Sequence, residues 1–552
     1  MPSLELPLAV VPILMNAGAA LMPAILGLFA SAAALIFKPR ELFRLFVKKP
    51  LIPVSILVGA LAIYYGWGLI GGGQTTPAAA NKREANPNVG SSTDWASVAL
   101  EILRQEELAR AGGRTITETP EAGREVVSSS EPLIYRKNAQ RTGYAGGPAP
   151  VGLLPLWEYR EENTMYLSSP LPAGDVVYGA SCYLDPPASF GAVFCLDAAT
   201  GKVRWQTDVE NPETQQEFTG FFSSPALSAD GKNLVIGQGL HLDANAELIC
   251  LDAHTGAVRW LVKTPLHIES SPAIEGDIVV VGAGAIEKGA DHKPEGDPLG
   301  SGHPGYVFAV RISDGKELWR YDLVDPEGSP AIENGIAYIG SGVNGAAVAA
   351  LRIASDEELK SAGQERLVWK VKTPFAATGA VSLVNDLVII GCGRGDFVFS
   401  DPNPEGVVLA LDKATGSVRW STKLPDTVLG AIAVNDGKAI VPVRNGELVA
   451  LDITDGRILW RQEDPKKRIS GTAPLLSGPA FTGNLIYASS RDGHLAIIDP
   501  ANGAILERVY INAPDRPGEL GLSFSSPFVA DGRVYIGSET GGLRAFVGKE
   551  SR

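Results

Sequence analysis

Residues 410–420 read ALDKATGSVRW, and this stretch decides the fold because close copies of it recur along the chain. The Asp side chain can accept backbone N–H groups across a tight turn, and the Gly supplies the positive φ that a tight hairpin needs. The residues after the Gly alternate between polar and apolar side chains, as in a half-buried strand. The stretch therefore reads as the end of one strand, a tight turn and a second strand that carries a Trp.

These copies belong to a longer repeat of about 50 residues. Each repeat opens with Ser-Pro or a degenerate version of it, passes through an Asp/Asn-Gly turn into an apolar strand, and ends with the pattern quoted above. A repeat of this period with four short strands predicts an all-β, eight-bladed β-propeller of four-stranded blades over residues 134–549. The eight starts are Ser169-Pro170, Ser224-Pro225, Ser271-Pro272, Ser329-Pro330, Gly379-Ala380, Ala431-Ile432, Gly478-Pro479 and Ser526-Pro527.

A Trp occupies the same place in the fourth strand of nearly every repeat. This regularity predicts that each indole wedges between neighbouring blades and donates its N–H across the junction. The seventh repeat has Glu507 at this place, and in one repeat a polar insertion at residues 354–365 replaces the tight turn. The predicted blade-docking residues are Trp157, Trp205, Trp260, Trp319, Trp369, Trp420 and Trp460.

The two ends of the repeat array predict how the ring closes. The eighth repeat stops after its third strand, at residues 542–547. A segment with the character of the missing fourth strand, residues 156–159, stands before the first repeat and contains Trp157. We expect this segment to complete the last blade, which removes the edge strands that would otherwise favour aggregation.

Two uncharged segments, residues 6–37 and 50–75, precede the repeats. Each is longer than the ~20 residues that cross a bilayer. We predict a transmembrane hairpin within residues 1–75, with spans at about 13–37 and 51–72 that contact the lipid bilayer over residues 6–37 and 51–72. A secretory signal peptide explains the first segment less well, because the segment lacks a basic n-region and follows Glu5.

The loop between the two predicted spans carries five basic residues, at positions 38, 40, 44, 48 and 49. The positive-inside rule places this loop in the cytoplasm and the propeller outside. The prediction is a multi-pass protein of the inner (cytoplasmic) membrane with its propeller in the periplasm or another extracytoplasmic space. Residues 76–133 are predicted to form a flexible linker with a short helix at about 94–111, either a solvated spacer or a docking element.

Charge and cysteine content narrow the possible partners. The formal net charge of the 552 residues is −14, and residues 1–72 contribute +3, so the remainder carries −17. Nucleic acid is therefore a poor partner for the large domain, and we predict no nucleic-acid partner. The four cysteines (Cys182, Cys195, Cys250 and Cys392) form no C-x-x-C motif and no adjacent pair, so we expect buried free thiols.

The repeat resembles the PQQ-like, or quinoprotein-type, β-propeller repeat. Its hallmark, Ala-x-Asp-x-x-Thr-Gly-x-x-x-Trp, is matched by residues 410–420 and closely by residues 195–205 and 250–260. Residues 135–143, YRKNAQRTG, are similar to the lead-in that precedes many such propellers. The resemblance implies two rival functions: a dehydrogenase that holds PQQ and Ca²⁺ at the centre of the ring, and a non-enzymatic scaffold of the BamB type.

The sequence favours the scaffold. A quinoprotein dehydrogenase needs a carboxylate and amide cluster for the cation, and commonly has a vicinal disulfide, but no Cys-Cys pair is present and most loops are short. We predict a membrane-anchored, extracytoplasmic protein-interaction scaffold that binds protein at a propeller face, with no catalytic residue and no cofactor. The alternative is a PQQ- or metal-dependent oxidoreductase. The scaffold differs from the BamB type in having no lipobox cysteine near the N-terminus.

Two loops hold candidate site residues. The longest loop between strands, residues 283–305, contains Asp291, His292 and His303, a mixture that could bind a metal. A glycine-rich stretch contains Arg394 and Asp396, which could reach the mouth of the ring. Solvated loops and a surface ion pair are the simpler interpretations of both sets.

Overall fold

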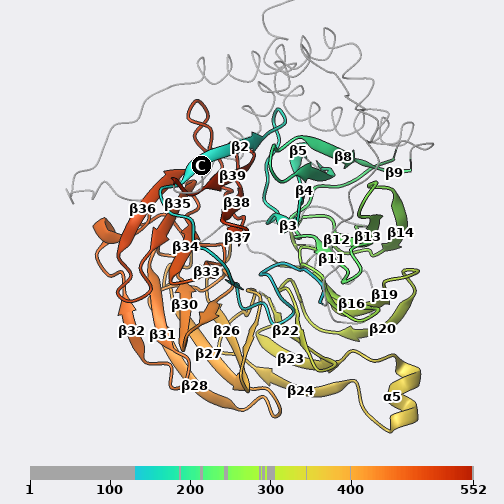
Figure 1. Cartoon of the computed structure of the whole chain (residues 1–552). Helices are drawn as coiled ribbons and strands as arrows, with labels where there is room; N and C mark the ends of the chain where they lie inside the picture. The colour runs from blue at the N-terminus through green and yellow to red at the C-terminus, as the bar shows by residue number, and fades with distance from the viewer. Residues whose placement is uncertain are drawn as a thin grey trace, which may run out of the picture. The chain divides into compact units, whose positions relative to one another are not determined.

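The computed structural model describes residues 131–549 except 186–187, 212–215, 241–245, 285–286, 289–292, 295–304, 343–344 and 398–399. Eight β-sheets surround a common axis as the blades of a propeller (Figure 1). Seven blades have four strands each, and blade 7 has a fifth strand, β1 (Tyr144–Ala145), paired in parallel with its innermost strand. The predicted all-β, eight-bladed architecture is confirmed.

The predicted membrane spans and the predicted helix at 94–111 lie outside the described residues. Within the part of the chain that the structure describes, no helix combines the length and apolar character needed to cross a bilayer.

Each blade is an antiparallel meander that begins near the axis and ends at the rim (Figure 1). The innermost strands are β3 (Leu171–Ala173), β11 (Ala226–Leu227), β15 (Ala273–Glu275), β21 (Ala331–Glu333), β25 (Ser382–Val384), β29 (Ala433–Asn435), β33 (Ala480–Thr482) and β37 (Phe528–Ala530). The second strands are β4 (Val176–Ala180), β12 (Asn233–Gly237), β16 (Ile278–Ala283), β22 (Ile336–Ser341), β26 (Leu387–Gly393), β30 (Lys438–Pro442), β34 (Leu485–Ser489) and β38 (Arg533–Gly537).

The outer half of the blades contains the tight turn and the Trp wherever the repeat keeps them. The third strands are β7 (Val193–Asp197), β13 (Glu247–Asp252), β19 (Tyr306–Arg311), β23 (Ala347–Arg352), β27 (Gly406–Asp412), β31 (Leu448–Asp452), β35 (His494–Ile498) and β39 (Leu543–Val547). The rim strands are β8 (Val203–Thr207), β14 (Val258–Lys263), β20 (Glu317–Asp322), β24 (Leu367–Lys372), β28 (Val418–Leu424), β32 (Ile458–Arg461), β36 (Ile505–Tyr510) and β2 (Leu154–Tyr159).

A few short elements lie between these strands. The insertion in blade 4 forms helix α5 (Asp356–Ala362), which begins with a capping box between Ser355 and Glu358 and ends at Gly363 in the left-handed conformation. The remaining elements are three hairpins and one 3-10 turn: β5 (Tyr183–Asp185) with β6 (Ala188–Phe190), β9 (Val209–Asn211) with β10 (Gln216–Glu217), β17 (Glu287–Lys288) with β18 (Lys293–Pro294), and η1 (Pro465–Lys467).

The predicted start of the fifth repeat is one residue out of register. Strand β25 begins at Ser382, whereas its counterpart β21 begins at Ala331, directly after Ser329-Pro330. The pair equivalent to Ser-Pro is therefore Ala380-Val381 and not Gly379-Ala380. The repeat has lost both marker residues here, so the sequence pattern gave no fixed point for the alignment.

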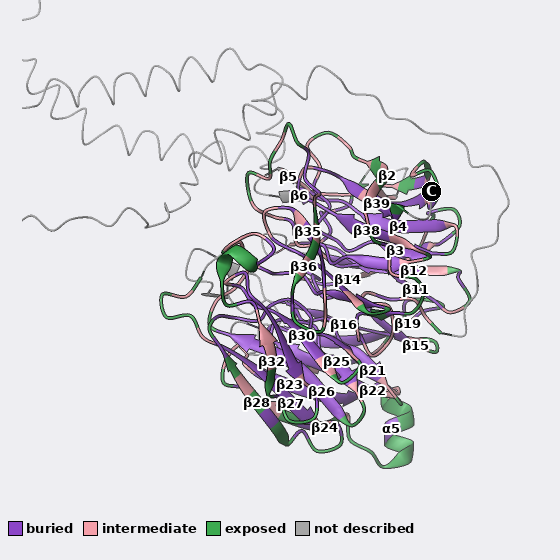
Figure 2. Cartoon of the chain, turned by 60° about the vertical axis from the view of Figure 1, so that its left-hand side comes forward, coloured by how far each residue is buried: buried purple, intermediate pink, exposed green. Residues whose placement is uncertain are grey.

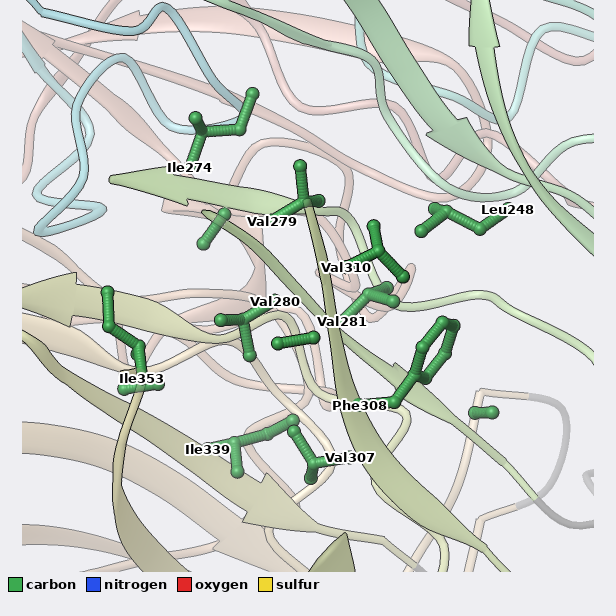
Figure 3. Packing of buried hydrophobic residues seen from close by; sticks show 14 of the residues in the cluster. Leu248, Ile274, Val279, Val280, Val281, Val307, Phe308, Val310, Ile339 and Ile353 are labelled. Carbon is green, nitrogen blue, oxygen red and sulfur yellow. The ribbon is translucent and has the colours of Figure 1, made fainter. Parts of the chain in front are cut away.

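The hydrophobic core lies between adjacent blades. Every residue of β26 is buried, whereas the rim strand β28 alternates between exposed and buried positions. Figure 2 shows the same contrast between the buried strands of the blades and the more exposed connections around them. Figure 3 shows Val281, Phe308 and Ile339 packed together from blades 3 and 4. The inner strands are continuously apolar because each blade has a neighbouring blade packed against either face.

Each Trp of the repeat reaches into the next blade. The indole N–H of Trp420 donates to the carbonyl of Ile453 at 2.9 Å, and a side chain at Gly456 would collide with the ring. Gly456 has φ of 73° and so fulfils two requirements, the left-handed turn and the close approach of the indole. Equivalent bonds of 2.8–3.0 Å join Trp157 to Ala198, Trp205 to Ala253, Trp260 to Ile312, Trp319 to Ile353, Trp369 to Lys413 and Trp460 to Pro500.

Blade 4 replaces the Gly with an Arg. Its helical insertion removes the tight turn, and Arg366 places its guanidinium 4.3 Å from the ring centre of Trp319. Arg366 also donates to the carboxylate of Asp356 at 2.6 Å, which ties the start of α5 to the same junction. A cation–π contact thus covers the indole where no glycine turn is available.

The ring closes as the sequence predicts. Strand β2 pairs antiparallel with β39, and Trp157 lies opposite Ala545. The seventh blade, which lacks the Trp, docks differently: the carboxylate of Glu507 accepts the backbone N–H groups of Gly152 and Leu153 at 2.7 and 2.6 Å. Because β39 and β2 come from opposite ends of the chain, blade 8 has no Asp-Thr-Gly turn and presents N–H donors instead of a carbonyl. An acceptor side chain is therefore needed where the other blades use a donor.

Candidate functional site

The propeller has two faces that differ in their connections. Because neighbouring strands are antiparallel, the connections between the first and second strands and between the third and fourth strands share one face, which we name the turn face. The opposite face, named the loop face, carries the connections between the second and third strands and the connections between blades. Arg394 and Asp396 follow β26 and lie on the loop face.

The Ser-Pro starts form a hydrogen-bonded ring around the axis. Where the next blade starts with Ser, the backbone N–H of the first start residue donates to the hydroxyl of that Ser, so these hydroxyls join blades and are not poised as nucleophiles. The ring is interrupted where the sequence has Ala380, Ala431 and Gly478. The bonds, 2.9–3.0 Å long, run from Ser169 to Ser224, Ser224 to Ser271, Ser271 to Ser329, Gly478 to Ser526 and Ser526 to Ser169.

A cavity of about 70 Å³ lies on the axis inside this ring. Three phenylalanines from blades far apart in the sequence line it on the loop-face side: Phe222, Phe397 and Phe524. Their ring centres are 5.6–5.9 Å apart, with tilted and edge-on orientations. Such contacts between aromatic rings are favourable, so the three rings cover the channel as one cluster. We name these three residues the phenylalanine cluster.

The lead-in, residues 133–145, crosses the centre of the ring (Figure 1), and its Tyr135 lines the cavity. Its backbone carbonyls at Ala139, Gln140, Thr142 and Gly143 accept N–H groups from the innermost strands of blades 4, 5, 6 and 7. The fully buried Arg141 donates to the carbonyls of Pro330, Ser271 and Tyr135. The lead-in thus uses hydrogen-bonding groups that the short innermost strands leave free along the axis.

PQQ does not fit this cavity. Small-molecule sites usually enclose ~300–1,000 Å³, and the axial cavity holds about 70 Å³ between the lead-in and the phenylalanine cluster. Two carboxylates, Glu269 and Glu327, line it, and the buried His267 lies 3.2 Å from Glu327. No three His, Cys, Asp or Glu side chains among the described residues are grouped as a metal site. The described residues around this cavity therefore offer neither the volume for a quinone nor a group of three such ligands for calcium.

The loop candidates have separate surroundings. The guanidinium of Arg394 lies 4.9 Å from the ring centre of Phe375 and 3.6 Å from the carboxylate of Glu405. The backbone carbonyl of Asp396 accepts the Nε–H of Arg444 at 2.8 Å. The proposed metal ligands Asp291, His292 and His303 lie outside the described residues.

The buried Glu539 and the half-buried Arg491 hold the segment that carries Phe524. Glu539 is buried and accepts the N–H groups of Leu520 and Leu522, both at 2.6 Å, in the segment that leads to Phe524. Arg491 donates to the carbonyl of Gly521 in the same segment, and burial lowers the pKa of Arg491. The centre of the loop face is therefore aromatic, fixed in place and surrounded by charged groups, an arrangement typical of the centre of a protein interface.

Among the four cysteines, Cys182 belongs to the hydrophobic cluster against which Phe222 and Phe524 pack. All four are buried free thiols, as the sequence predicts. Burial raises the pKa of Cys195, Cys250 and Cys392 to about 12, so these thiols stay protonated near neutral pH. Protonated, buried thiols are inert toward oxidants and metals.

Sequence analysis missed the phenylalanine cluster, although a signal existed. The tetrapeptide Phe-Ser-Ser-Pro occurs twice, beginning at Phe222 and at Phe524. The residue two positions before the first residue of each corrected start pair lines the cavity in all eight repeats. These residues are Leu167, Phe222, Glu269, Glu327, Thr378, Leu429, Leu476 and Phe524. Phe397 comes from a loop inside blade 5 and has no such marker.

Comparison with known proteins identifies the family. A family model described as outer membrane protein assembly factor BamB matches residues 189–293 and 355–552, more than half of the chain. The chain belongs to this family. A protein named outer membrane protein assembly factor BamB from Yersinia pestis is 26% identical over 64% of this chain and 80% of its own length. One of the same name from Shewanella oneidensis is 23% identical over 67% of this chain and 86% of its own length.

Solved structures share the propeller fold. The crystal structure of BamB from Moraxella catarrhalis superposes with a TM-score of 0.51 at 19% identity, over 72% of this chain and 98% of its own. Quinohemoprotein alcohol dehydrogenase from Comamonas testosteroni superposes with a TM-score of 0.53 at 15% identity, over 75% of this chain and 80% of its own. The fold is thus common to a BamB-type protein and a dehydrogenase, so the site has to distinguish between their functions.

Proposed function

We propose that this chain is a membrane-tethered scaffold that binds protein partners through the loop face of an extracytoplasmic propeller and that works without a quinone or metal cofactor. Its relatives are named outer membrane protein assembly factors, so assembly of outer membrane proteins is the process proposed for this chain. The observation that carries the proposal is the filled axis. With the lead-in below and the phenylalanine cluster above a cavity of about 70 Å³, the surface open to a large partner is the outer surface of the loops.

The proposed tether is the pair of apolar segments at residues 6–37 and 51–72. The basic residues between them favour a cytoplasmic loop, which leaves the propeller on the outer side of the inner membrane. Thiol labelling tests this topology, because the four native cysteines are buried and a new cysteine on the turn face would be the reactive one. We expect Asp455→Cys to react with a membrane-impermeant maleimide in cells with a permeabilised outer membrane and an intact inner membrane. Labelling only after the inner membrane is opened would contradict the topology.

Site-specific photocrosslinking tests the scaffold function. A photoreactive residue is placed at Arg394 on the loop face, and the matched control is placed at Asp455, an exposed position on the turn face. We expect the loop-face probe to give a discrete adduct with an outer membrane assembly protein in native membranes, and the turn-face probe to give none. Equal adducts from both faces, or none from the loop face, would contradict the proposal.

A further inference from the structure

Arg136 is a buried cation that the described residues leave unpaired. It is 4% exposed, and neither its Nε nor its Nη2 atom meets a hydrogen-bond partner in the part of the chain that the structure describes. Its guanidinium lies between Gly143 and Gly478, where any added side chain would collide with it. Burial lowers its pKa to about 10, so the side chain remains charged at neutral pH. A buried charge normally needs a partner of opposite charge or several hydrogen bonds.

The neighbouring Arg141, in contrast, has hydrogen-bond acceptors for its guanidinium group. Arg141 is fully buried too, and it donates to four backbone carbonyls, those of Pro330, Ser271, Pro272 and Tyr135. The protein thus supplies acceptors for one arginine of the lead-in and supplies none, among the described residues, to Nε and Nη2 of the other.

Beside Arg136 lies a second, smaller cavity of about 20 Å³. Arg136, Lys137 and the residues Ser169, Ser526 and Tyr135 contribute to its lining, and none of the described residues that line it is an Asp or Glu. Two cationic side chains with hydroxyl groups and no carboxylate provide the chemistry of an anion site. A space of ~10–15 Å³ is enough for one water-sized particle, so the cavity has room for a single-atom ion.

We propose that this cavity binds a monovalent halide-class anion, chloride in the cell, between Arg136 and Lys137. The cavity is also lined by Ala480 of blade 7 and Phe528 of blade 8, so the bound anion fastens the lead-in to the two blades beside the closure of the ring. Lys137 is held over this site with its Nζ 5.6 Å from the ring centre of Phe528. The site is separate from the loop face, and it stands or falls independently of the scaffold function.

Chloride NMR on the full chain in detergent tests binding directly. We expect the chain to broaden the chloride line, and bromide to compete for the site. Arg136→Gln should abolish the excess broadening, whereas the control Arg394→Gln, an exposed arginine on the loop face, should retain it. Equal broadening by the unmodified chain and by Arg136→Gln would overturn the proposal.

The second test measures how chloride changes the folding stability of the unmodified chain and of an Arg136 variant. When chloride replaces gluconate at constant ionic strength, the apparent folding constant of the unmodified chain should rise up to tenfold for each tenfold increase in chloride above its Kd. Arg136→Met should not respond, and it should be more stable than the unmodified chain in gluconate, because it removes an unpaired buried charge. If chloride does not change the stability of the unmodified chain, the proposal is overturned. The hydrogen-bond partner of Arg136 would then be a water molecule or a residue outside the described part of the chain.

Crystallography of the unmodified chain tests the site without any variant. Crystals grown with bromide in place of chloride should show an anomalous peak within hydrogen-bond distance of the Arg136 guanidinium and the Ser526 hydroxyl. Absence of this peak, with the guanidinium bonded to water or to chain atoms, would refute the site.

Discussion

Glu507 at the closure of the ring offers a sharp test of how the blades dock. Its carboxylate accepts two backbone N–H groups, from Gly152 and Leu153, at 2.7 and 2.6 Å. In Glu507→Gln the amide keeps one acceptor oxygen and turns an NH₂ group toward the second N–H. One charge-assisted bond is lost and the other is weakened, so the free energy of unfolding should fall by about 2–3 kcal/mol.

Restoring the repeat consensus should make the protein less stable. In Glu507→Trp the indole N–H would meet the N–H groups of Gly152 and Leu153 instead of a carbonyl, and blade 8 has no glycine turn to receive the ring. We expect a loss at least as large as that of Glu507→Gln. The N-terminal strand β2 should also be released first, and it should become accessible to limited proteolysis at lower urea concentrations.

Urea unfolding of the full chain in detergent, followed by Trp fluorescence, measures both variants. The matched control is Glu317→Gln, a change in the rim strand β20 at a side chain that pairs with the partly exposed Arg320. Surface changes of this kind usually stay within about 0.5 kcal/mol. A Glu507→Gln protein as stable as the control, or a Glu507→Trp protein more stable than the unmodified chain, would refute the donor and acceptor logic of the closure.

Three further predictions concern the junctions, the thiols and the axis. Trp420→Phe keeps an aromatic side chain but leaves the carbonyl of Ile453 without its 2.9 Å indole donor. Chemical denaturation should therefore show a free energy of unfolding lower by about 1–3 kcal/mol. Burial raises the pKa of Cys195, Cys250 and Cys392 from 9.0 to about 12, so unfolding releases protons above pH 9. Their contribution to stability is complete below pH 9 and is lost as the pH rises toward 12. The urea concentration at the unfolding midpoint should therefore be lower at pH 10 than at pH 8. This difference should be smaller in a variant in which the three cysteines are replaced by Ala. Incubation with PQQ and Ca²⁺ should give neither quinone absorbance on the repurified protein nor dye-linked alcohol oxidation, and gain of both would replace the scaffold function with the dehydrogenase alternative.

Local sequence patterns predicted the blades because each strand and turn obeys its own chemistry. The Asp-x-x-Thr-Gly turn needs no distant residue, since Asp412 accepts the N–H groups of Ala414 and Thr415 within the same turn. The pairing of β2 with β39 was also predictable, because a missing fourth strand at one end and a surplus one at the other leave a single way to fill the blade.

The exceptions to the repeat needed the three-dimensional structure. Glu507 looked like a lapse in the Trp pattern, and only the closure shows that it faces donors instead of a carbonyl. Arg366 stands one residue beyond the polar insertion at residues 354–365 and carried no sequence-based prediction, and only the fold places it over Trp319. The chemistry of each residue suits the groups that it contacts in the folded protein. Those groups are distant in the chain or belong to another blade.

The amino-acid sequence by itself determined the number of blades, their strands, the Trp at each junction and the strand that closes the ring. These features depend on contacts that repeat at a fixed spacing. Only the tertiary structure decided what happens on the axis: that the lead-in crosses the centre of the ring, that Phe222, Phe397 and Phe524 meet above it, and that Arg136 lies buried beside an anion-sized cavity. The physical reason is that the axis is where all eight blades converge, so its contacts join residues from unrelated positions in the chain and leave no periodic trace.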